Sequence, residues 1–212
     1  MALQVVLIGP PACGKGTQGR HLAEATGAAY FSTGKQLRRE MEAATPLGRE
    51  AVRYLDAGQY VPDTMAQELA FHWLRDVAGG WILDGFPRTL AQARELDRFL
   101  GAGRDVLQAV LLDVPAEELE ERVTHRRECL LCSWVGTRGK AETSGNCPVC
   151  GGGLRSRADD AAESFRMRMA VYDELTRPVI DHYVESARLR RVSGLGTPGE
   201  VYERMQSLLE LS

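Results

Sequence analysis

The feature that most constrains this chain lies in residues 3–17. An apolar run over residues 3–8 is followed by the sequence GPPACGKGT over residues 9–17. The run predicts a strand buried on both faces, and the helical spacing of residues 18–25 ends at Gly27. A strand, a Gly-x-x-x-x-Gly-Lys loop and a helix together form a P-loop, whose backbone N–H groups surround a phosphate. An ordinary glycine-rich turn is the alternative, but the complete motif in this setting favours phosphate binding.

Inside this loop, Gly9 and Gly14 permit the tight turn that aims the N–H groups inward. Lys15 adds a positive charge at the β- and γ-phosphates. The next residue is Gly16 rather than serine or threonine, so the hydroxyl that usually binds Mg²⁺ is displaced to Thr17.

Length and composition favour one soluble domain with small insertions. The chain has 212 residues, of which 44% are hydrophobic and 26% charged. No apolar stretch is long enough to span a bilayer, and the N-terminal run lacks the basic start of a signal peptide, so we expect a cytoplasmic protein. The net charge of −3 disfavours a general nucleic-acid binder. Arginines that neutralise an anionic ligand must therefore be concentrated locally.

Four of the five cysteines form two Cys-x-x-Cys pairs, namely Cys129 with Cys132 and Cys147 with Cys150. In a reducing compartment such pairs bind metal more often than they form disulfides. Four thiolates complete a tetrahedral shell with no open position, so the predicted metal is structural rather than catalytic.

The remaining elements alternate between strands and helices and predict an α/β fold. Further strands are expected at residues 30–31, 81–83, 106–114 and 189–192. A helical stretch over residues 45–76, in which Asp63 caps a helix, interrupts this alternation and predicts a flap on the core.

Asp84 follows the strand at residues 81–83, at the strand end where open parallel sheets bind ligands. A turn or a helix cap is the alternative for an aspartate in this place. Beside a P-loop, the position favours a carboxylate that orients Mg²⁺.

Two later helices carry arginines. In the helix that begins at Pro115, Arg122 and Arg126 are four residues apart and are predicted to lie on one face. This spacing fits a solvated basic face and an anion site equally well. A second helix contains Arg168 and is predicted to end near Pro178.

Together these motifs resemble those of the adenylate kinase family, and the likeness extends over essentially the whole chain. They are GPPACGKGTQ at residues 9–18, Ser-Thr-Gly at residues 32–34 with Arg38, and LDGFPRT at residues 83–89 with Gln92. Arg126, the segment RADD at residues 157–160 and Arg168 are similar to the family's lid arginines and lid exit. The cysteine pairs resemble the zinc-bearing lid of part of the family.

The resemblance implies a three-layer P-loop α/β fold with a five-stranded parallel sheet. It implies a core of residues 1–31, 62–125 and 158–212, a helical flap of residues 32–61 that binds the nucleoside monophosphate, and a zinc-ribbon lid of residues 126–157. The implied reaction is reversible phosphoryl transfer from Mg-ATP to AMP to give two ADP, with adenine nucleotide homeostasis as its role. Expected cofactors are Mg²⁺ with ATP and structural Zn²⁺, and the expected state is a monomer that binds neither nucleic acid nor membranes.

The resemblance also assigns residues to roles. The implied catalytic residues are Lys15, Arg88, Arg126, Arg157 and Arg168. The implied ATP-binding residues are Gly9, Ala12, Cys13, Gly14, Lys15, Gly16, Thr17, Arg122 and Arg126. The implied AMP-binding residues are Thr33, Arg38, Val61, Gly85, Phe86, Pro87, Arg88, Gln92, Arg157 and Arg168. Asp84 would orient Mg²⁺, and Cys129, Cys132, Cys147 and Cys150 would hold the zinc.

The chemistry agrees with these roles. The second pKa of a phosphate monoester is about 6, so the attacking oxygen of AMP is mostly ionised at neutral pH and needs no general base. What the reaction needs is alignment, neutralisation of phosphate charge and a lid that excludes water.

Three other functions compete with this interpretation. A kinase for another monophosphate is disfavoured because Gln92 can pair with an adenine edge, and because pyrimidine monophosphate kinases usually carry alanine and asparagine at the positions of Thr33 and Gln92. A P-loop switch protein is disfavoured because no Asn-Lys-x-Asp motif occurs. A zinc-ribbon module for nucleic acid is disfavoured by the acidic total charge. One departure from the family stands beside the AMP motif, where Lys35 replaces the usual aspartate.

Overall fold

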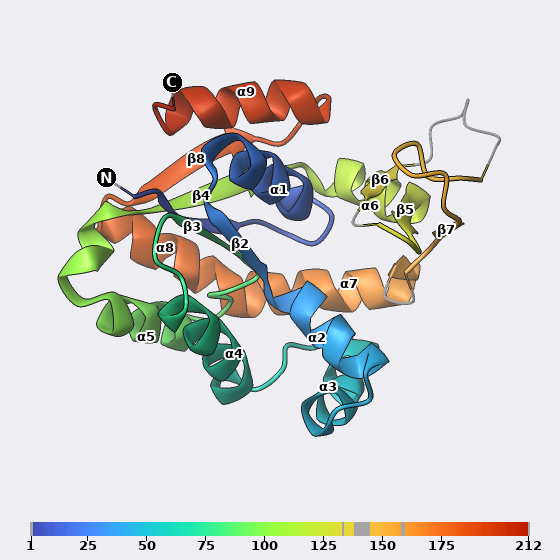
Figure 1. Ribbon diagram of the computed structural model, residues 1–212, viewed down its shortest axis with the longest axis horizontal. Coiled ribbons are helices and arrows are strands. Elements are labelled where there is room, and N and C mark those ends of the chain that lie inside the picture. Colours follow the sequence, from blue (N-terminus) through green and yellow to red (C-terminus); the bar gives the residue numbers. More distant parts are fainter. Residues whose placement is uncertain (1, 133, 138–144, 158–159, 212) are drawn as a thin grey trace.

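The computed structural model describes residues 2–132, 134–137, 145–157 and 160–211. Its centre is a sheet of five parallel strands in the order β2-β3-β1-β4-β8 (Figure 1). The strands are β1 (Gln4–Ile8), β2 (Ala29–Ser32), β3 (Trp81–Asp84), β4 (Leu107–Asp113) and β8 (Leu189–Ser193). The predicted five-stranded parallel sheet is therefore confirmed.

β1 lies in the middle of this sheet and is buried on both sides. Val5 and Leu7 pack in one hydrophobic cluster, whereas Val6 and Ile8 pack in the other, and none of the four is more than 2% exposed. Alternate residues of a strand point to opposite faces, so an unbroken apolar run suits a strand covered twice. The P-loop therefore leaves the sheet from its most enclosed strand.

Helices cover both faces of the sheet and give three layers (Figure 1). The cluster with Val5 and Leu7 includes residues of α1 (Lys15–Thr26), α6 (Ala116–His125) and α9 (Pro198–Leu208). The cluster with Val6 and Ile8 includes residues of α4 (Asp63–Arg75), α5 (Leu90–Leu100) and α8 (Arg177–Glu185). A short helical segment, η1 (Gly101–Val106), joins α5 to β4. No described helix is both long and apolar enough to cross a membrane.

Two helices, α2 (Thr33–Glu42) and α3 (Pro46–Asp56), project from the sheet as the flap (Figure 1). Thr45 caps α3, because its side chain accepts a hydrogen bond from the Gly48 amide. A Cβ atom at Gly48 would lie 2.0 Å from the Glu40 carbonyl oxygen. Only glycine therefore lets the two flap helices pack this closely.

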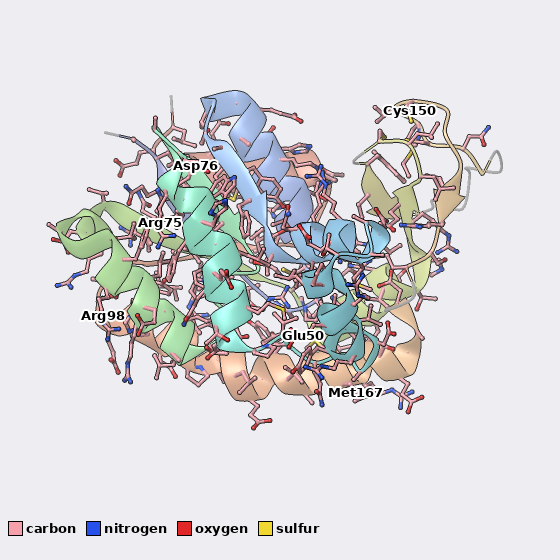
Figure 2. All side chains as sticks on the ribbon, turned by 60° about the horizontal axis from the view of Figure 1, so that its bottom comes forward. Glu50, Arg75, Asp76, Arg98, Cys150 and Met167 are labelled. Atoms are coloured by element: carbon pink, nitrogen blue, oxygen red, sulfur yellow. The ribbon has the colours of Figure 1, made fainter. Side chains whose placement is uncertain are left out.

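A second, three-stranded antiparallel sheet forms the lid, with the order β6-β5-β7. Its strands are β5 (Arg126–Cys129), β6 (Val135–Thr137) and β7 (Leu154–Arg155). Figure 2 shows Cys150 at the outer end of this lid, remote from Arg75 and Asp76 at the end of α4.

Several predicted helix boundaries are wrong. α1 begins at Lys15 rather than at Gln18, because Gly14 is its N-cap in a left-handed conformation. Asp63 does not cap α4, whose N-cap is Pro62. The Asp63 carboxylate instead accepts hydrogen bonds from the side chains of Thr89 and Gln92.

The predicted helix end near Pro178 is also wrong. α7 (Ala162–Val171) continues through a π-helical turn, η3 (Tyr172–Thr176), into α8. Proline has no amide hydrogen to donate to the helix. The wider π turn just before Pro178 changes the pattern of backbone hydrogen bonds at this point. The helix therefore passes Pro178 without ending.

Arg122 and Arg126 do not share a helix face, contrary to prediction. α6 ends at His125, and Arg126 has an extended conformation with ψ of 135° that begins β5. The spacing of four residues therefore spans the junction between the core and the lid.

Candidate active site

The P-loop is shaped by two glycines with positive φ. A Cβ atom at Gly9, where φ is +152°, would lie 2.6 Å from Cys13 Sγ and 2.8 Å from the Leu112 carbonyl oxygen. Gly14, with φ of +102°, turns the chain into α1, and its carbonyl oxygen accepts hydrogen bonds from the amides of Thr17 and Gln18 at 3.0 Å each. The loop thereby brings the positive end of the α1 dipole to the cleft.

Lys15 folds back over this loop. Its Nζ atom donates hydrogen bonds to the carbonyl oxygens of Gly9 at 2.6 Å and Pro10 at 2.9 Å, and lies 3.5 Å from Cys13 Sγ. The charge is thus held at the mouth of the loop by acceptors that a phosphate can replace.

Asp84 stands beside the P-loop because β3 pairs with β1 and places it opposite Leu7. Its Oδ2 atom accepts a hydrogen bond of 2.7 Å from the Tyr30 hydroxyl. Burial, and then the Asp84 charge, raise the pKa of Tyr30, so this hydroxyl stays protonated and donates. A Cβ atom at Gly16 would lie 3.5 Å from Asp84 Oδ2, which is an ordinary contact, so the residue after the P-loop lysine lies directly beside this carboxylate.

A cleft of about 1,070 Å³ opens between the core, the flap and the lid. Its wall contains the P-loop from Ala12 to Thr17 and the Asp84 side chain. Six of the predicted arginines also line it: Arg38, Arg88, Arg122, Arg126, Arg157 and Arg168. Residues separated by more than a hundred positions therefore surround one space that is suited to a polyanion.

Acceptors within 3 Å hold Arg122, Arg126 and Arg157. Arg126 forms a two-point ion pair with Asp160, one contact of which joins Nε to Oδ2 at 2.8 Å. Arg157 donates from Nε to Glu128 Oε2 at 2.7 Å. Arg122 donates to Glu118 and to the Gly194 carbonyl oxygen, both at 2.8 Å. Such contacts orient long side chains before a ligand arrives.

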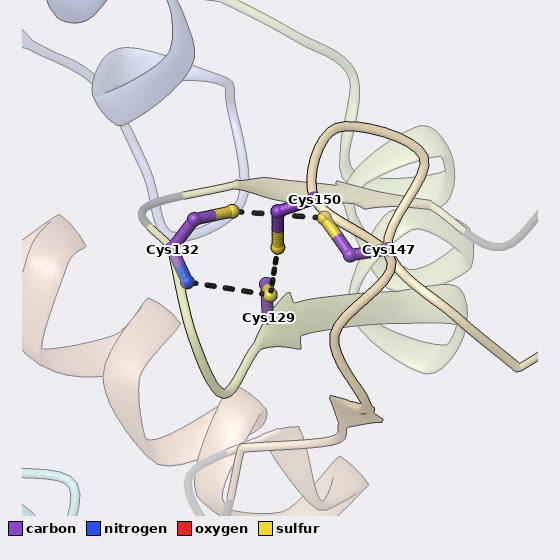
Figure 3. A group of neighbouring side chains, drawn as sticks. All are labelled: Cys129, Cys132, Cys147 and Cys150. Atoms are coloured by element: carbon purple, nitrogen blue, oxygen red, sulfur yellow. Dashed lines mark hydrogen bonds between the residues drawn. The ribbon is translucent and has the colours of Figure 1, made fainter.

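The four predicted metal ligands come together at the end of the lid (Figure 3). All four Sγ atoms lie within 4.8 Å of one another, and the pairs Cys129–Cys150 and Cys132–Cys147 are 3.4 and 3.6 Å apart. A tetrahedral zinc site with Zn–S bonds of about 2.3 Å has sulfur atoms about 3.8 Å apart, so the cluster fits this ion. Burial raises the pKa of the Cys129 thiol, but the N–H groups of Leu131 and Cys132 outweigh it and lower this pKa to about 6.

A family model described as adenylate kinase matches residues 7–188 of the chain. The chain belongs to the adenylate kinase family. It is 40% identical to an adenylate kinase of Thermodesulfovibrio yellowstonii, over 98% of this chain and 99% of that protein. It is 38% identical to an adenylate kinase of Methanothrix thermoacetophila and 39% identical to one of Clostridium tetani, over 98% of each chain in both comparisons. The expected class, a phosphotransferase of the adenylate kinase type, is thereby confirmed.

Arg88 lines the cleft of this adenylate kinase, and contacts with its main chain fix its position there. Its backbone N–H donates to Gln92 Oε1 at 2.7 Å, and its carbonyl oxygen accepts from the Thr176 hydroxyl at 2.9 Å. Gly85 has φ of +80°, which favours glycine, and a Cβ atom there would lie 2.8 Å from Arg88 Nη2, so the glycine also leaves space for the guanidinium across this turn.

The other predicted AMP residues lie behind the cleft wall. Gln92 and Thr33 are 1% and 2% exposed, and Val61 and Phe86 are also buried in the core. The Gln92 amide donates to Asp63 Oδ1 at 2.7 Å. In contrast, the Thr33 hydroxyl has no hydrogen-bond partner within the described part of the chain. Phe86 and Val61 can therefore offer a nucleotide their backbone rather than their side chains.

Sequence reasoning missed Tyr30, Tyr60, Glu128 and Asp63 as partners of site residues. Tyr30 and Tyr60 belong to short apolar segments that look like core, and neither carries a motif. Glu128 had the clearest signal, since it is the single acid between two arginines and the first metal-binding cysteine. Its contact to Arg157 depends on strand pairing within the lid, which the spacing alone does not show.

Proposed function

We propose that this chain transfers the terminal phosphoryl group of Mg-ATP to AMP, reversibly, and forms two ADP. The observation that carries this proposal is the cleft, which is lined by the P-loop with Lys15, by Asp84 and by all six of the predicted arginines. Two nucleotides that meet through their phosphates would bring their negative charge to this space.

On the ATP side, the backbone of Gly9 and of residues 12–17 would surround the phosphates. Lys15 would exchange its carbonyl acceptors for phosphate oxygens, and Arg126 would approach the same phosphates from the lid. Arg122, which lies at the junction of α6 and the lid, would face the adenine. Asp84 and Thr17 would hold the Mg²⁺ that accompanies ATP, and this ion would supply neutralisation of phosphate charge.

On the AMP side, Arg38 of the flap, Arg88 and Arg168 of the core and Arg157 of the lid would bind the phosphate. Thr33, Val61, Gly85, Phe86, Pro87 and Gln92 would surround the base. The buried Thr33 hydroxyl supports this assignment, because a buried polar group without a partner is costly unless a ligand completes it.

Lys15, Arg88, Arg126, Arg157 and Arg168 would stabilise the charge of the transferred group. Since the acceptor phosphate is already ionised, catalysis would rest on alignment and neutralisation, with no residue removing a proton. Closure of the lid over the cleft would exclude water, which otherwise competes for the phosphoryl group.

Zn²⁺ would be held by Cys129, Cys132, Cys147 and Cys150, and it would fix the fold of the ribbon. The four thiolates would leave no open coordination position, so its function would be structural. We assign residues 1–31, 62–125 and 158–212 to the core, residues 32–61 to the flap and residues 126–157 to the lid. A cytoplasmic monomer that binds no nucleic acid stays our prediction.

A coupled assay of ADP formation tests this function with AMP, GMP, UMP and CMP as acceptors in turn. We expect AMP to be the preferred acceptor. A matched measurement on Gln92→Ala should show a higher KM for AMP and a nearly unchanged KM for ATP. A higher kcat/KM for UMP or CMP than for AMP in the unaltered protein would contradict the assignment of the acceptor.

A further inference from the structure

One carboxylate, that of Glu128, lies in the cleft wall among the lid arginines. Glu128 is on β5, and strand pairing places it directly opposite Arg155 of β7. Its Oε1 atom accepts a hydrogen bond of 2.9 Å from Arg155 Nε, and its Oε2 atom accepts one of 2.7 Å from Arg157 Nε. The side chains of Glu128 and Arg157 are only 13% and 16% exposed.

A carboxylate beside a phosphate site carries a cost, because it repels the ligand. Both oxygens of the Glu128 carboxylate are occupied by guanidinium groups, those of Arg155 and Arg157. The contact with Arg157 must therefore bring the site a benefit that exceeds the repulsion between Glu128 and a bound phosphate.

The geometry of the contact suggests this benefit. A guanidinium carries five N–H donors in a rigid planar fork, and a contact through Nε fixes the plane of that fork. Arginine also has a long side chain whose freedom is lost when a ligand binds. An arginine whose plane is already fixed loses less of this freedom on binding a phosphate.

We propose that Glu128 is a positioning residue, which orients the Arg157 guanidinium toward the phosphates before the nucleotides arrive. This inference rests on the proposed function of Arg157 as a phosphate ligand. Arg155 orients Glu128 in turn, because it lies on the neighbouring strand and donates a hydrogen bond to the other carboxylate oxygen.

The opposite possibility is that Glu128 competes with the phosphate for Arg157. The two possibilities differ in the sign of their effect. Removal of a competitor strengthens AMP binding, whereas removal of a positioning group weakens the alignment of the reacting phosphates and lowers kcat.

The deciding variant is Glu128→Gln, which keeps the size and shape of the side chain and removes its charge. We expect a kcat about tenfold lower, with AMP bound no more tightly in a calorimetric titration. The matched control is Glu42→Gln, because Glu42 also contacts Arg155, at 3.4 Å, but is 65% exposed. The control should keep kcat within about twofold of the unaltered protein.

A double-mutant cycle shows whether Glu128 acts through Arg157. In an Arg157→Ala background, Glu128→Gln should cause no further loss of kcat, because the side chain that it positions is absent. A further loss of tenfold in that background would overturn the inference. Unchanged kcat in Glu128→Gln with a lower melting temperature would also overturn it, since a purely structural contact gives that result.

These measurements separate the inference from the proposed function. If Arg157→Ala keeps full activity, the phosphate-binding role of Arg157 fails and the inference fails with it. If Arg157→Ala loses activity while Glu128→Gln does not, only the inference fails. Tighter AMP binding by Glu128→Gln identifies the carboxylate as a competitor and rejects a positioning function.

Discussion

The aromatic ring of Tyr60 lies against the Arg88 guanidinium, with 4.7 Å between Arg88 Cζ and the ring centroid. The Tyr60 hydroxyl shares a hydrogen bond of 3.0 Å with the Thr176 hydroxyl, which in turn donates to the Arg88 carbonyl oxygen. The side chain and the main chain of one arginine are thus both held by Tyr60, a residue at the exit of the flap. Thr176 belongs to the π-helical turn η3, so this irregular turn supplies one of the residues that hold Arg88.

Replacement of Tyr60 tests this contact. Tyr60→Leu should raise the KM for AMP by about 2- to 30-fold, because a cation–π contact of about 0.5–2 kcal/mol is lost. The KM for ATP should stay nearly the same. Tyr60→Phe keeps the ring and should show a smaller rise. Steady-state kinetics with AMP varied at saturating ATP would measure both, and equal AMP constants in Tyr60→Leu and the unaltered protein would contradict the prediction.

Lys15→Met should leave the fold intact and lower kcat/KM by about a hundredfold or more, which corresponds to about 3 kcal/mol of transition-state stabilisation. The reason is that Lys15 is the cation held at the mouth of the P-loop. Circular dichroism would verify the fold, and the coupled assay would measure turnover. A folded variant with near-normal turnover would exclude a catalytic function for this lysine.

The metal site gives a third prediction. Elemental analysis of the native protein should find one bound zinc or iron per chain, and Cys147→Ser should lower the unfolding temperature of the lid before it abolishes activity at low temperature. A loosened lid should also raise ATP hydrolysis relative to phosphoryl transfer.

Val149→Ser is the matched control for the metal site, because Val149 lies between two of the cysteines and is 71% exposed without being a ligand. It should retain the metal and the stability of the native protein. A metal-free protein with unchanged stability would mean that the cysteine cluster has no structural function.

A half-buried ion-pair cluster away from the cleft predicts a dependence of stability on pH. Asp97 accepts two hydrogen bonds of 2.7 Å from Arg188 and one of 2.9 Å from His182 Nε2. Burial raises the pKa of Asp97, but these partners outweigh it and lower the pKa below its usual value. Because the folded pKa lies below the unfolded value of about 4, the stabilisation is complete above that pH and is lost as the pH falls through the folded pKa.

Asp97→Asn should therefore lower the free energy of unfolding by about 2 kcal/mol at pH 7, and this difference should shrink below about pH 4. Urea titrations at several pH values would measure it. Asp105→Asn serves as the control, because Asp105 is 80% exposed and should change stability by less than about 0.5 kcal/mol. A difference between Asp97→Asn and the unaltered protein that does not depend on pH would contradict the linkage.

The sequence predicted those features that a short stretch of chain determines. The P-loop, the strand that precedes Asp84 and the cysteine pairs each depend on spacing over a few residues, and the structure brings the P-loop and Asp84 to one cleft and the four cysteines to one cluster. The sequence did not predict that the helix continues past Pro178. The expectation that proline ends a helix takes no account of packing, on which the π turn before Pro178 depends.

Contacts between residues far apart in the chain could not be predicted from the sequence. Tyr60 and Thr176 are 116 positions apart, Tyr30 and Asp84 are 54 apart, and Asp63 and Gln92 are 29 apart. Each pair forms because sheet order and helix packing bring the two chain segments together. Local patterns mark Asp84, Gln92 and Asp63 one by one but do not show which residue each of them meets, so these contacts become visible only in three dimensions.

The pairing of β5 with β7 closes the metal-binding ribbon at its base. Cys129 stands opposite Leu154 in this pairing, so the chain enters and leaves the ribbon at neighbouring points. β6 lies within the ribbon and pairs with the other edge of β5, where Thr137 stands opposite Arg126. A loss of order in the ribbon would therefore reach this arginine through one strand pairing.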